Sequence, residues 1–600
     1  MVKFNRTYQP NDNDAPGKGV GKEDPPLKNG SERKFMDYRT YIAKKLPDCG
    51  VPAEEIAAAV TVPPDRSMGD YALPCFKFAK AMRKSPVRIA EDLAAGFPAD
   101  HVIESATAVN GYLNFKVNRK GLTEDTLKEI AEKGSAYGSA KTGNGKTICI
   151  DYSSINVAKP FHIGHLSTTV IGAALYRIFG FLGYKVVGIN HLGDYGTQFG
   201  KLIYAYKAWG TKEGVEKGGV KELTRLYVKY HKEAENNPAM DDEARRYFKL
   251  IEQGDEECNE LFNRFKEITL KEVSRIYDEL DVRFDSYAGE SFYNDKMQPV
   301  IDELEEKGLL KTSEGAKIVD LSDYGMPPCL ILRSDGASLY ATRDLAAACY
   351  RKATYDFDKC LYVVAYQQNL HFRQIFKVLE LMGKPWAKDL IHVAYGMVSL
   401  LDENGNQVAM STRNGTVVLL EDVLNKCHEK CLEVIEKKNP DLEGKEEIAR
   451  QVGTGAVIFA ALSNSKIKDI AFSYDKILNF DGETGPYVQY TAARIKSVLR
   501  KAGKSGGYTI NEINEDEYAL ISALAAFPET VAAAADKLEP FFITRYAIEL
   551  SSLYNKFYFE HKILGSEENA KNFRIALSEA TLTVLTNALT LLGIKTPERM

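Results

Sequence analysis

The sequence predicts an α/β domain with a parallel sheet, preceded by a small α+β domain and followed by an all-α bundle. The first observation is a strand–helix–strand unit. Residues 146–154 (KTICIDYSS) and 184–190 (YKVVGIN) have the pattern of strands, and residues 164–181 between them have an apolar helical stripe at Leu166, Val170, Ala174 and Ile178. This order favours two parallel strands joined by a right-handed crossover.

Two further observations complete the prediction. Residues 360–368 (CLYVVAYQQ) and 390–398 (LIHVAYGMV) have the continuous apolar character of strands buried on both faces. From about Glu421 the strand signals end, and stretches such as YAIELSSLYNKFYF (546–559) carry apolar residues at helical spacing. The sheet therefore precedes a helical bundle in the chain.

The remaining elements follow in chain order. The start of the chain is rich in Asp, Asn, Gly, Pro and Lys, which is typical of a disordered tail. Helical patterns in FMDYRTYIAKKL and RIAEDLAAGF, with a strand at 112–117, predict a small N-terminal domain. The expected parts are the tail 1–33, the N-terminal domain 34–120, a linker 121–146, the α/β domain 147–420 with a helical insertion at about 201–280, and the bundle 421–600.

Composition narrows the classes of function. A chain of 600 residues is too long to fold around a single hydrophobic core, so several domains are expected. A formal net charge of −5 excludes a protein dominated by a basic surface. A local basic face for nucleic acid is still compatible with that charge. We find no apolar run long enough to span a bilayer and expect no membrane association. Among nine cysteines, the close pair Cys427 and Cys431 has no matching second pair, so we expect reduced thiols in the cytoplasm and no structural metal.

The segment AKPFHIGHLS (158–167) carries the clearest chemical signal. His162 and His165 lie where a strand of a parallel sheet gives way to a helix, which is where such folds bind phosphates. Gly164 leaves the backbone open to a nucleotide, and imidazole donors can stabilise charge on an attacked phosphate. Two histidines at the start of a helix can also have a purely structural role, in capping or packing. The surrounding sequence must therefore distinguish this role from ligand binding.

That surrounding sequence resembles the class I aminoacyl-tRNA synthetases, specifically the arginyl-tRNA synthetase family. The resemblance is carried by SSINVAKPFHIGHLSTT, NHLGDYGTQFGKL, GESFY, SLYATRDLAAA, YVVAYQQNLHF, AMSTRNG, TGPYVQYTAARI and the terminal PERM, in the family's order. It implies a Rossmann-type class I catalytic domain, an N-terminal domain that contacts the corner of tRNA and a helical anticodon-binding domain. It also implies ATP-dependent activation of L-arginine to arginyl-adenylate and transfer to the 3'-terminal ribose of tRNA(Arg), with release of pyrophosphate and AMP.

The resemblance also implies the roles of residues in arginine binding. A guanidinium needs carboxylates and hydroxyls around it. Asp344 and Tyr340, at an expected strand-to-helix turn, would hold the guanidinium with Glu290. Asn156 and Gln368 would hold the α-amino and carboxylate end, with Asp151 nearby, although most relatives carry Glu at that position. A site of this kind rejects neutral amino acids without an editing domain.

The second class I signature, a K-M-S-K-type loop, is degenerate here as AMSTRNG (409–415). Met410, Ser411 and Arg413 are the expected ATP contacts in this loop. Family members with such a loop often place a lysine just before the histidine motif, and Lys159 stands there. With His162, Gly164, His165 and Arg413, it is expected to stabilise the departing pyrophosphate of ATP with Mg²⁺. The alternative for Lys159 is a solvated surface charge without a role in catalysis.

Candidate RNA contacts are aromatic and basic residues. Aromatic rings stack on splayed bases and cations contact the backbone, although an aromatic stripe at helical spacing is more often packing. The resemblance singles out Tyr112 and Asn114 in the N-terminal domain, and Tyr487, Tyr490, Arg494 and Tyr554 in the bundle. We expect a monomer. The alternatives are another class I synthetase, such as the cysteinyl or glutaminyl enzyme, and an inactive RNA-binding relative, for which the degenerate loop is the one feature in favour.

Overall fold

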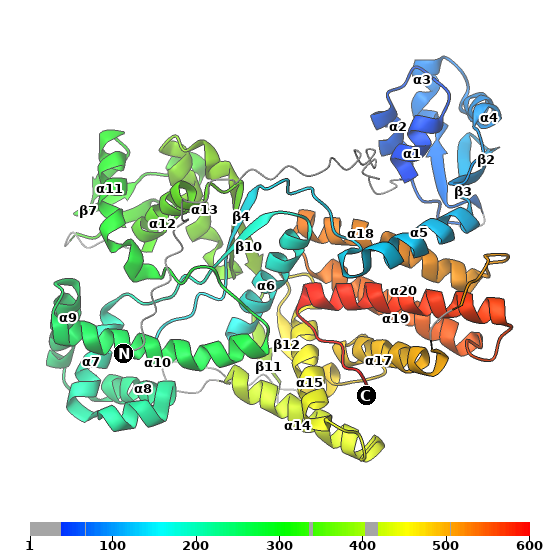
Figure 1. Cartoon of the computed structure of the whole chain (residues 1–600). Helices are drawn as coiled ribbons and strands as arrows, with labels where there is room; N and C mark the ends of the chain where they lie inside the picture. The colour runs from blue at the N-terminus through cyan, green and yellow to red at the C-terminus, as the bar shows by residue number, and fades with distance from the viewer. Residues whose placement is uncertain (1–37, 66–67, 335–339, 402–417, 504–505) are drawn as a thin grey trace, which may run out of the picture. The chain divides into compact units, whose positions relative to one another are not determined.

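The computed structural model describes residues 38–65, 68–334, 340–401, 418–503 and 506–600 (Figure 1). The chain separates into two compact units, residues 1–117 and 118–600, which are described in turn. The predicted tail 1–33 lies outside the described residues.

The first unit is a three-stranded antiparallel sheet in the order β1-β3-β2, with helix α4 packed on β2 and β3. The predicted helices and the strand at 112–117 are confirmed, whereas β1 and β2 were not predicted. The elements are α1 (Tyr38–Lys45), α2 (Ala53–Ala59), β1 (Tyr71–Pro74), η2 (Cys75–Phe78), α3 (Ala79–Met82), α4 (Pro86–Gly96), β2 (Ile103–Val109) and β3 (Tyr112–Val117).

The second unit is organised around a four-stranded parallel sheet in the order β10-β9-β4-β5. All four predicted strands are confirmed as β4 (Thr147–Asp151), β5 (Lys185–Ile189), β9 (Lys359–Ala365) and β10 (Leu390–Tyr395). The predicted helix is also confirmed as η4 (Ile163–His165) followed by α6 (Leu166–Phe181), and the stripe from Leu166 to Ile178 is buried. Helices α12 (Tyr340–Tyr355) and α13 (Asn369–Leu381) complete the α/β domain.

Two insertions interrupt this sheet between β5 and β9. The first is helical, as predicted for about 201–280, and comprises α7 (Thr197–Trp209), α8 (Lys212–Ala234), α9 (Ala239–Glu252) and α10 (Glu256–Glu279). The second is an antiparallel meander in the order β6-β7-β8, preceded by η5 and α11. Its elements are η5 (Glu290–Lys296), α11 (Met297–Glu306), β6 (Leu310–Ser313), β7 (Ala316–Val319), η6 (Ser322–Tyr324) and β8 (Cys329–Leu332).

The C-terminal part is helical, with one short parallel pair formed by β11 (Val398–Leu400) and β12 (Ile470–Phe472). Strand β12 corrects the expectation that strands end near Glu421. Helix α5 (Arg119–Lys133) covers much of the predicted linker and packs against α18 and α20. The other elements are η3 (Gly134–Ala136), η7 (Tyr366–Gln368), η8 (Pro385–Asp389), α14 (Leu420–Lys438), α15 (Lys445–Leu462), α16 (Tyr474–Ile477), α17 (Gly485–Ala502), α18 (Glu515–Lys537), α19 (Phe541–Glu560) and α20 (Glu568–Leu592).

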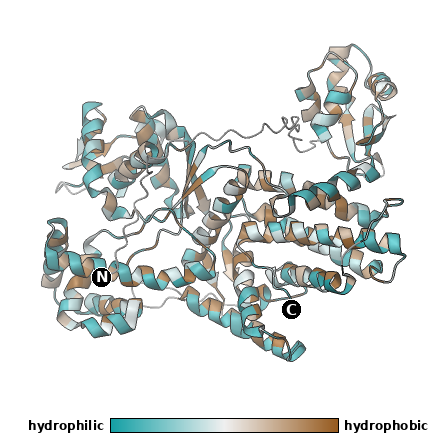
Figure 2. Ribbon diagram, in the orientation of Figure 1, coloured by the Kyte–Doolittle hydropathy of each residue, from teal (hydrophilic) through white to brown (hydrophobic). Residues whose placement is uncertain are grey.

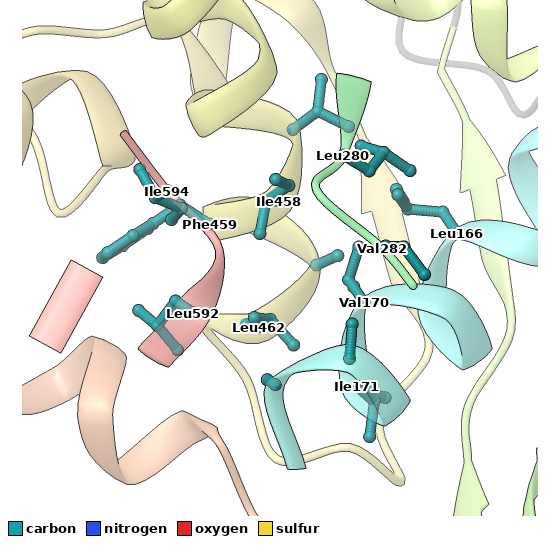
Figure 3. Close-up of a cluster of buried hydrophobic side chains, with 14 of the residues drawn as sticks. Leu166, Val170, Ile171, Leu280, Val282, Ile458, Phe459, Leu462, Leu592 and Ile594 are labelled. Carbon is teal, nitrogen blue, oxygen red and sulfur yellow. The ribbon is translucent and has the colours of Figure 1, made fainter. Parts of the chain in front are cut away.

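The bundle and the sheet domain share one hydrophobic core. Figure 3 shows Leu462 of α15 between Val170 of α6 and Leu592 of α20, and all three belong to one hydrophobic cluster. Leu280 and Val282, which follow α10, join the same cluster. The helix that begins at the paired histidines is therefore packed directly on the helical bundle.

Two bundle helices are long and apolar enough to cross a membrane by length and composition, although each contains charged residues and neither is an uninterrupted apolar run. Helices α18 and α20 pass that test, with 44% and 67% of their most apolar windows buried. Their hydrophobicity has a local reason, because α18 packs on α5 and α19, and α20 packs on α6, α17 and α19. In Figure 2 both hydrophobic and hydrophilic residues are seen on the helices of the bundle.

Candidate active site

The paired histidines lie at a topological switch point of the parallel sheet. In the order β10-β9-β4-β5, the connection that leaves β4 runs to β5 on one side, and the connection that leaves β9 runs to β10 on the other side. A crevice forms at the carboxyl ends of strands at such a point. The loop that follows β4 enters η4 and α6 there and carries His162, Gly164 and His165.

Backbone hydrogen bonds fix the orientation of both imidazoles. The Gly164 N–H donates to His162 Nδ1 at 3.1 Å, and the His162 N–H donates to His165 Nδ1 at 3.2 Å. Because each Nδ1 accepts a hydrogen bond, Nε2 of each neutral ring carries the proton and can donate it to a ligand. The two rings lie 4.0 Å apart, and His165 stacks on Phe161 at 5.1 Å.

Burial keeps these histidines neutral. It lowers the pKa of His165 to about 3, with His162 as a further cause. It also lowers the pKa of His162, helped by the positive charge of Lys159. A Cβ at Gly164 would lie 2.8 Å from His162 Cε1, so a side chain there would displace the ring. The arrangement presents two N–H donors to an anionic ligand.

The segment that follows the second signature pairs with the histidine loop. The Ile163 N–H donates to the Val418 carbonyl at 3.0 Å, and the Leu420 N–H donates to the Phe161 carbonyl at 3.0 Å. Met410, Ser411 and Arg413 lie outside the described residues. Lys159 is half-buried on the same loop as His162.

A carboxylate with two histidine neighbours lies on α12. Asp344 Oδ2 is 2.7 Å from His371 Nε2, and its Oδ1 is 3.9 Å from His191 Nε2. Burial raises the pKa of Asp344, but His371 and His191 outweigh this and the net pKa is lowered. Asp344 lies inside α12 and not at the predicted strand-to-helix turn. Tyr340, one turn earlier on the same face, is exposed.

A second carboxylate, Glu290, opens η5. Its Oε2 lies 3.8 Å from Arg343 Nη1, which is longer than a hydrogen bond, and burial raises the Glu290 pKa to about 7. The buried Asp194 fixes the next residue, since it accepts hydrogen bonds from the Ser291 N–H at 2.8 Å and the Ser291 hydroxyl at 2.9 Å. This leaves the Glu290 carboxylate with capacity for a further cationic partner.

The other residues predicted to contact arginine differ in whether their side chains are available to a ligand. Asp151 is 4% exposed and is already paired with the fully buried Arg351 at 2.7 Å. Asn156 pairs with Gly193, where a Cβ would lie 2.3 Å from the Asn156 amide oxygen. Gln368 is exposed at the end of η7. The structure thus brings Asp344 and Glu290 near one another and gives Asp151 a partner within the chain.

Sequence reasoning missed several residues of this region. His191 and His371 lie inside the motifs NHLGDYG and YVVAYQQNLHF. His191 follows β5, and His371 lies in the first turn of α13, the helix that follows β9, so their position was a usable signal. Arg343 lies in the SLYATRDLAAA motif and stacks on the Tyr195 ring at 4.2 Å. The partner of Asp151, Arg351, had no signal in the sequence.

The predicted RNA contacts separate into exposed and buried residues. Tyr112 is 43% and Tyr490 40% exposed, whereas Asn114 is 5% exposed and Tyr554 fully buried. Tyr554 therefore presents no surface to RNA, and Asn114 presents very little. The Tyr487 hydroxyl accepts a hydrogen bond from the Asn555 amide at 3.0 Å.

Tyr490 lies in a basic groove of about 860 Å³ in the helical bundle. Arg494 stacks on Tyr490 at 4.9 Å and on Tyr558 at 5.3 Å. Aromatic and guanidinium planes of this kind suit single-stranded bases. The other basic residues that line the groove, none of them singled out from the sequence, are Arg500, Lys501, Lys562 and Arg599.

Comparison with known proteins matches three family models in sequence order. Residues 36–117 match the arginyl tRNA synthetase N terminal domain. Residues 126–474 match the family described as tRNA synthetases class I (R), catalytic domain. Residues 488–600 match the DALR anticodon binding domain.

Whole proteins match over nearly the full chain. The arginine–tRNA ligase of Clostridioides difficile is 53% identical over 573 residues, which cover 94% of this chain and 100% of that protein. The ligase of the same name from Clostridium beijerinckii is 50% identical over 570 residues, with the same coverage. Among solved structures, the arginyl-tRNA synthetase of Thermus thermophilus matches with a TM-score of 0.77 and 28% identity, over 90% of this chain and 96% of that one.

Proposed function

Because this chain belongs to the class I arginyl-tRNA synthetases, and is thus an arginine–tRNA ligase, we propose that the crevice at the paired histidines performs both steps of the ligase reaction. In the first step an arginine carboxylate oxygen attacks the α-phosphorus of ATP and pyrophosphate leaves. In the second, the 3'-terminal ribose hydroxyl of tRNA(Arg) attacks the arginyl carbonyl and AMP leaves. Neither step needs a protein nucleophile, so positioning and charge stabilisation supply the catalysis.

The observation that carries this proposal is the pair of Nε2–H donors. His162 and His165 donate to the phosphate oxygens as negative charge shifts onto the departing pyrophosphate. The ordered Nδ1 contacts at 3.1 and 3.2 Å mean that no reorientation of the rings is needed during the reaction. Lys159 adds positive charge on the same loop, with Met410, Ser411 and Arg413 as the expected phosphate contacts of the second signature.

The guanidinium of the substrate is held between Asp344 and Glu290, with the Tyr340 hydroxyl alongside. His371 and His191 orient the Asp344 carboxylate, since they lie 2.7 and 3.9 Å from its two oxygens. A bidentate carboxylate site rejects amino acids with neutral side chains, because its charges would then be unpaired.

The α-amino and carboxylate end of arginine lies at Asn156 and Gln368. The space that Gly193 leaves beside Asn156 allows the amide to face this end. Asp151 acts as the internal partner of Arg351 and shapes the floor of the pocket, which supports an indirect role for this carboxylate.

Magnesium enters with ATP, bound by its phosphates, and no structural metal is required. The anticodon loop of tRNA(Arg) docks in the groove at Tyr490, Arg494 and Tyr558, and the exposed Tyr112 ring contacts the outer corner of the tRNA. The enzyme acts as a cytoplasmic monomer. All nine cysteines are unpaired thiols, which suits a reducing compartment.

The test is arginine-dependent exchange of labelled pyrophosphate into ATP, run with and without tRNA(Arg). Exchange that requires tRNA supports a site completed by its RNA. Exchange without tRNA keeps the catalytic proposal and removes that requirement. The absence of exchange in both conditions, with tRNA still bound, would overturn the assignment of the crevice as the active site.

A further inference from the structure

The loop between β4 and the paired histidines has an unusual backbone. Ser153, Ser154 and Ala158 have φ values of 70°, 34° and 62°, in the left-handed region that residues with a Cβ rarely adopt. Each such residue is strained and persists where surrounding contacts hold it in place. Something outside the loop must therefore maintain its shape.

Helix α10 of the insertion supplies two of those contacts. The fully buried Thr269 hydroxyl accepts a hydrogen bond from the Ala158 N–H at 2.9 Å. The Tyr277 hydroxyl lies 2.8 Å from Ser153 Oγ and accepts from the Asn190 amide at 3.0 Å. Thr269 and Tyr277 are eight residues apart, so they lie on one face of the helix. Through Ala158 and Ser153 they hydrogen-bond to both ends of the strained loop.

The same contacts continue to the histidines by two routes. Ser153 Oγ is 2.8 Å from Thr169 Oγ1, which donates to the His165 carbonyl at 2.7 Å. The Tyr277 ring also packs edge-on against Phe161 at 5.6 Å, and Phe161 stacks on His165. The position of His165 is thus tied to Tyr277 through a hydrogen-bonded chain and through stacked rings.

We propose that Thr269 and Tyr277 are positioning residues, through which helix α10 holds the histidine loop in its reactive geometry. The proposal rests on the function proposed above, because it assigns the reactive geometry to His162 and His165. Neither side chain touches substrate in this scheme. Their effect is on where the imidazole donors lie relative to the α-phosphate when arginine attacks.

This role predicts a specific kinetic signature. A misplacement of about 1 Å in a catalytic group can reduce a rate about 100-fold without removing a binding contact. Loss of either hydroxyl should therefore lower kcat and leave KM for arginine and ATP nearly unchanged, because the interaction matters mainly in the transition state. A residue with a merely structural role would change the melting temperature and the amount of active enzyme, and serine at position 269 would not specifically restore kcat.

The experiment compares T269V and Y277F with two matched controls in the full-length enzyme. T224V removes a helix hydroxyl that donates within its own helix, to the Val220 carbonyl at 2.8 Å. Y546F removes a buried hydroxyl that bonds the Ala523 carbonyl at 2.8 Å in the bundle. T269S restores the hydroxyl at 269. The readout is kcat and KM for pyrophosphate exchange with tRNA(Arg) present, normalised to active-site titration.

The expected result is a fall in kcat of about 10–100-fold for T269V and Y277F, with KM for both substrates within about threefold of wild type. T269S should recover to within about threefold, and both controls should stay within about twofold of wild type. Variants no slower than their controls, or a loss that T269S does not reverse, would overturn the proposal. If T269V fails to fold, the comparison of kcat between Y277F and its control Y546F tests the proposal. Inactive wild-type enzyme would instead contradict the proposed function.

Discussion

The raised pKa of Glu290 predicts that arginine binding strengthens as pH rises through neutrality. Burial raises this pKa from 4.5 to about 7, and the nearby Asp344 and Asp194 add to it while Arg343 and Lys159 oppose it. Only the ionised carboxylate pairs with a guanidinium. The apparent dissociation constant should therefore exceed its high-pH limit about 11-fold at pH 6 and about 1.1-fold at pH 8, a tenfold improvement across that range.

The assay is calorimetric titration of arginine into the enzyme from pH 6 to 8.5, with E290Q as the test variant and D344N as the control. E290Q should bind about 10–150-fold more weakly than wild type at pH 8, because a charge-assisted contact is worth about 1.5–3 kcal/mol. Its affinity should also lose the pH dependence. D344N should bind more weakly and keep a pH dependence, since Glu290 remains, but this dependence should move to lower pH because the Asp344 charge no longer raises the Glu290 pKa. Wild-type affinity that is flat between pH 6 and 8, or a slope retained in E290Q, would refute the reasoning.

The same shift has an opposite effect on stability. Between pH 4.5 and about 7 the folded protein keeps a proton on Glu290 that the unfolded chain has released. The free energy of unfolding therefore falls as pH rises through this window, and above it the deficit stays constant. E290Q lacks this titration, so at pH 8 it should be more stable than wild type, by on the order of 3 kcal/mol. Denaturant unfolding at pH 5 and pH 8 measures the difference.

Three further predictions concern the other parts of the site. G164A should reduce kcat for exchange about 100-fold with little change in melting temperature, because its methyl group would displace the His162 ring; an active G164A enzyme would contradict the assigned geometry. D344N should raise KM for arginine about 10–100-fold and that for ATP much less, and equal changes in both would argue against guanidinium binding. Y490A should weaken tRNA(Arg) binding about 5–150-fold in a filter-binding assay, by loss of a stacking contact, with Y474A as an aromatic control outside the groove.

The elements that sequence reasoning predicted well are those with a strong local pattern. The four parallel strands are largely apolar runs, and the two central strands, β4 and β9, include fully buried residues such as Ile150 and Leu361. The stripe on α6 has helical spacing along its whole length. Strands β1 and β12 were not predicted because they are short, with four and three residues, and because β1 ends in a proline. Such short strands are set by their partners and not by their own sequence.

The candidate site was predictable in its motifs and not in its pairings. The histidines, Asp344 and Glu290 were located because each lies in a recognisable segment. The partner of Asp151 is Arg351, two hundred residues away, and periodicity cannot reveal that contact. The aromatic candidates show the same limit: Tyr490 and Tyr554 both lie on helices, but only the fold decides that one is exposed and the other buried.

The shared core in Figure 3 bears on how this protein can be divided. Val170 and Ile171 of α6 are buried against α15 and α20, so the helix that follows the paired histidines has no complete hydrophobic environment without the bundle. A fragment ending near residue 420 would expose that face to water at a cost of about 1.5–3 kcal/mol for each large side chain. The adenylate-forming and anticodon-reading parts are therefore not interchangeable modules, and recombination between relatives would have to carry α6, α15 and α20 together.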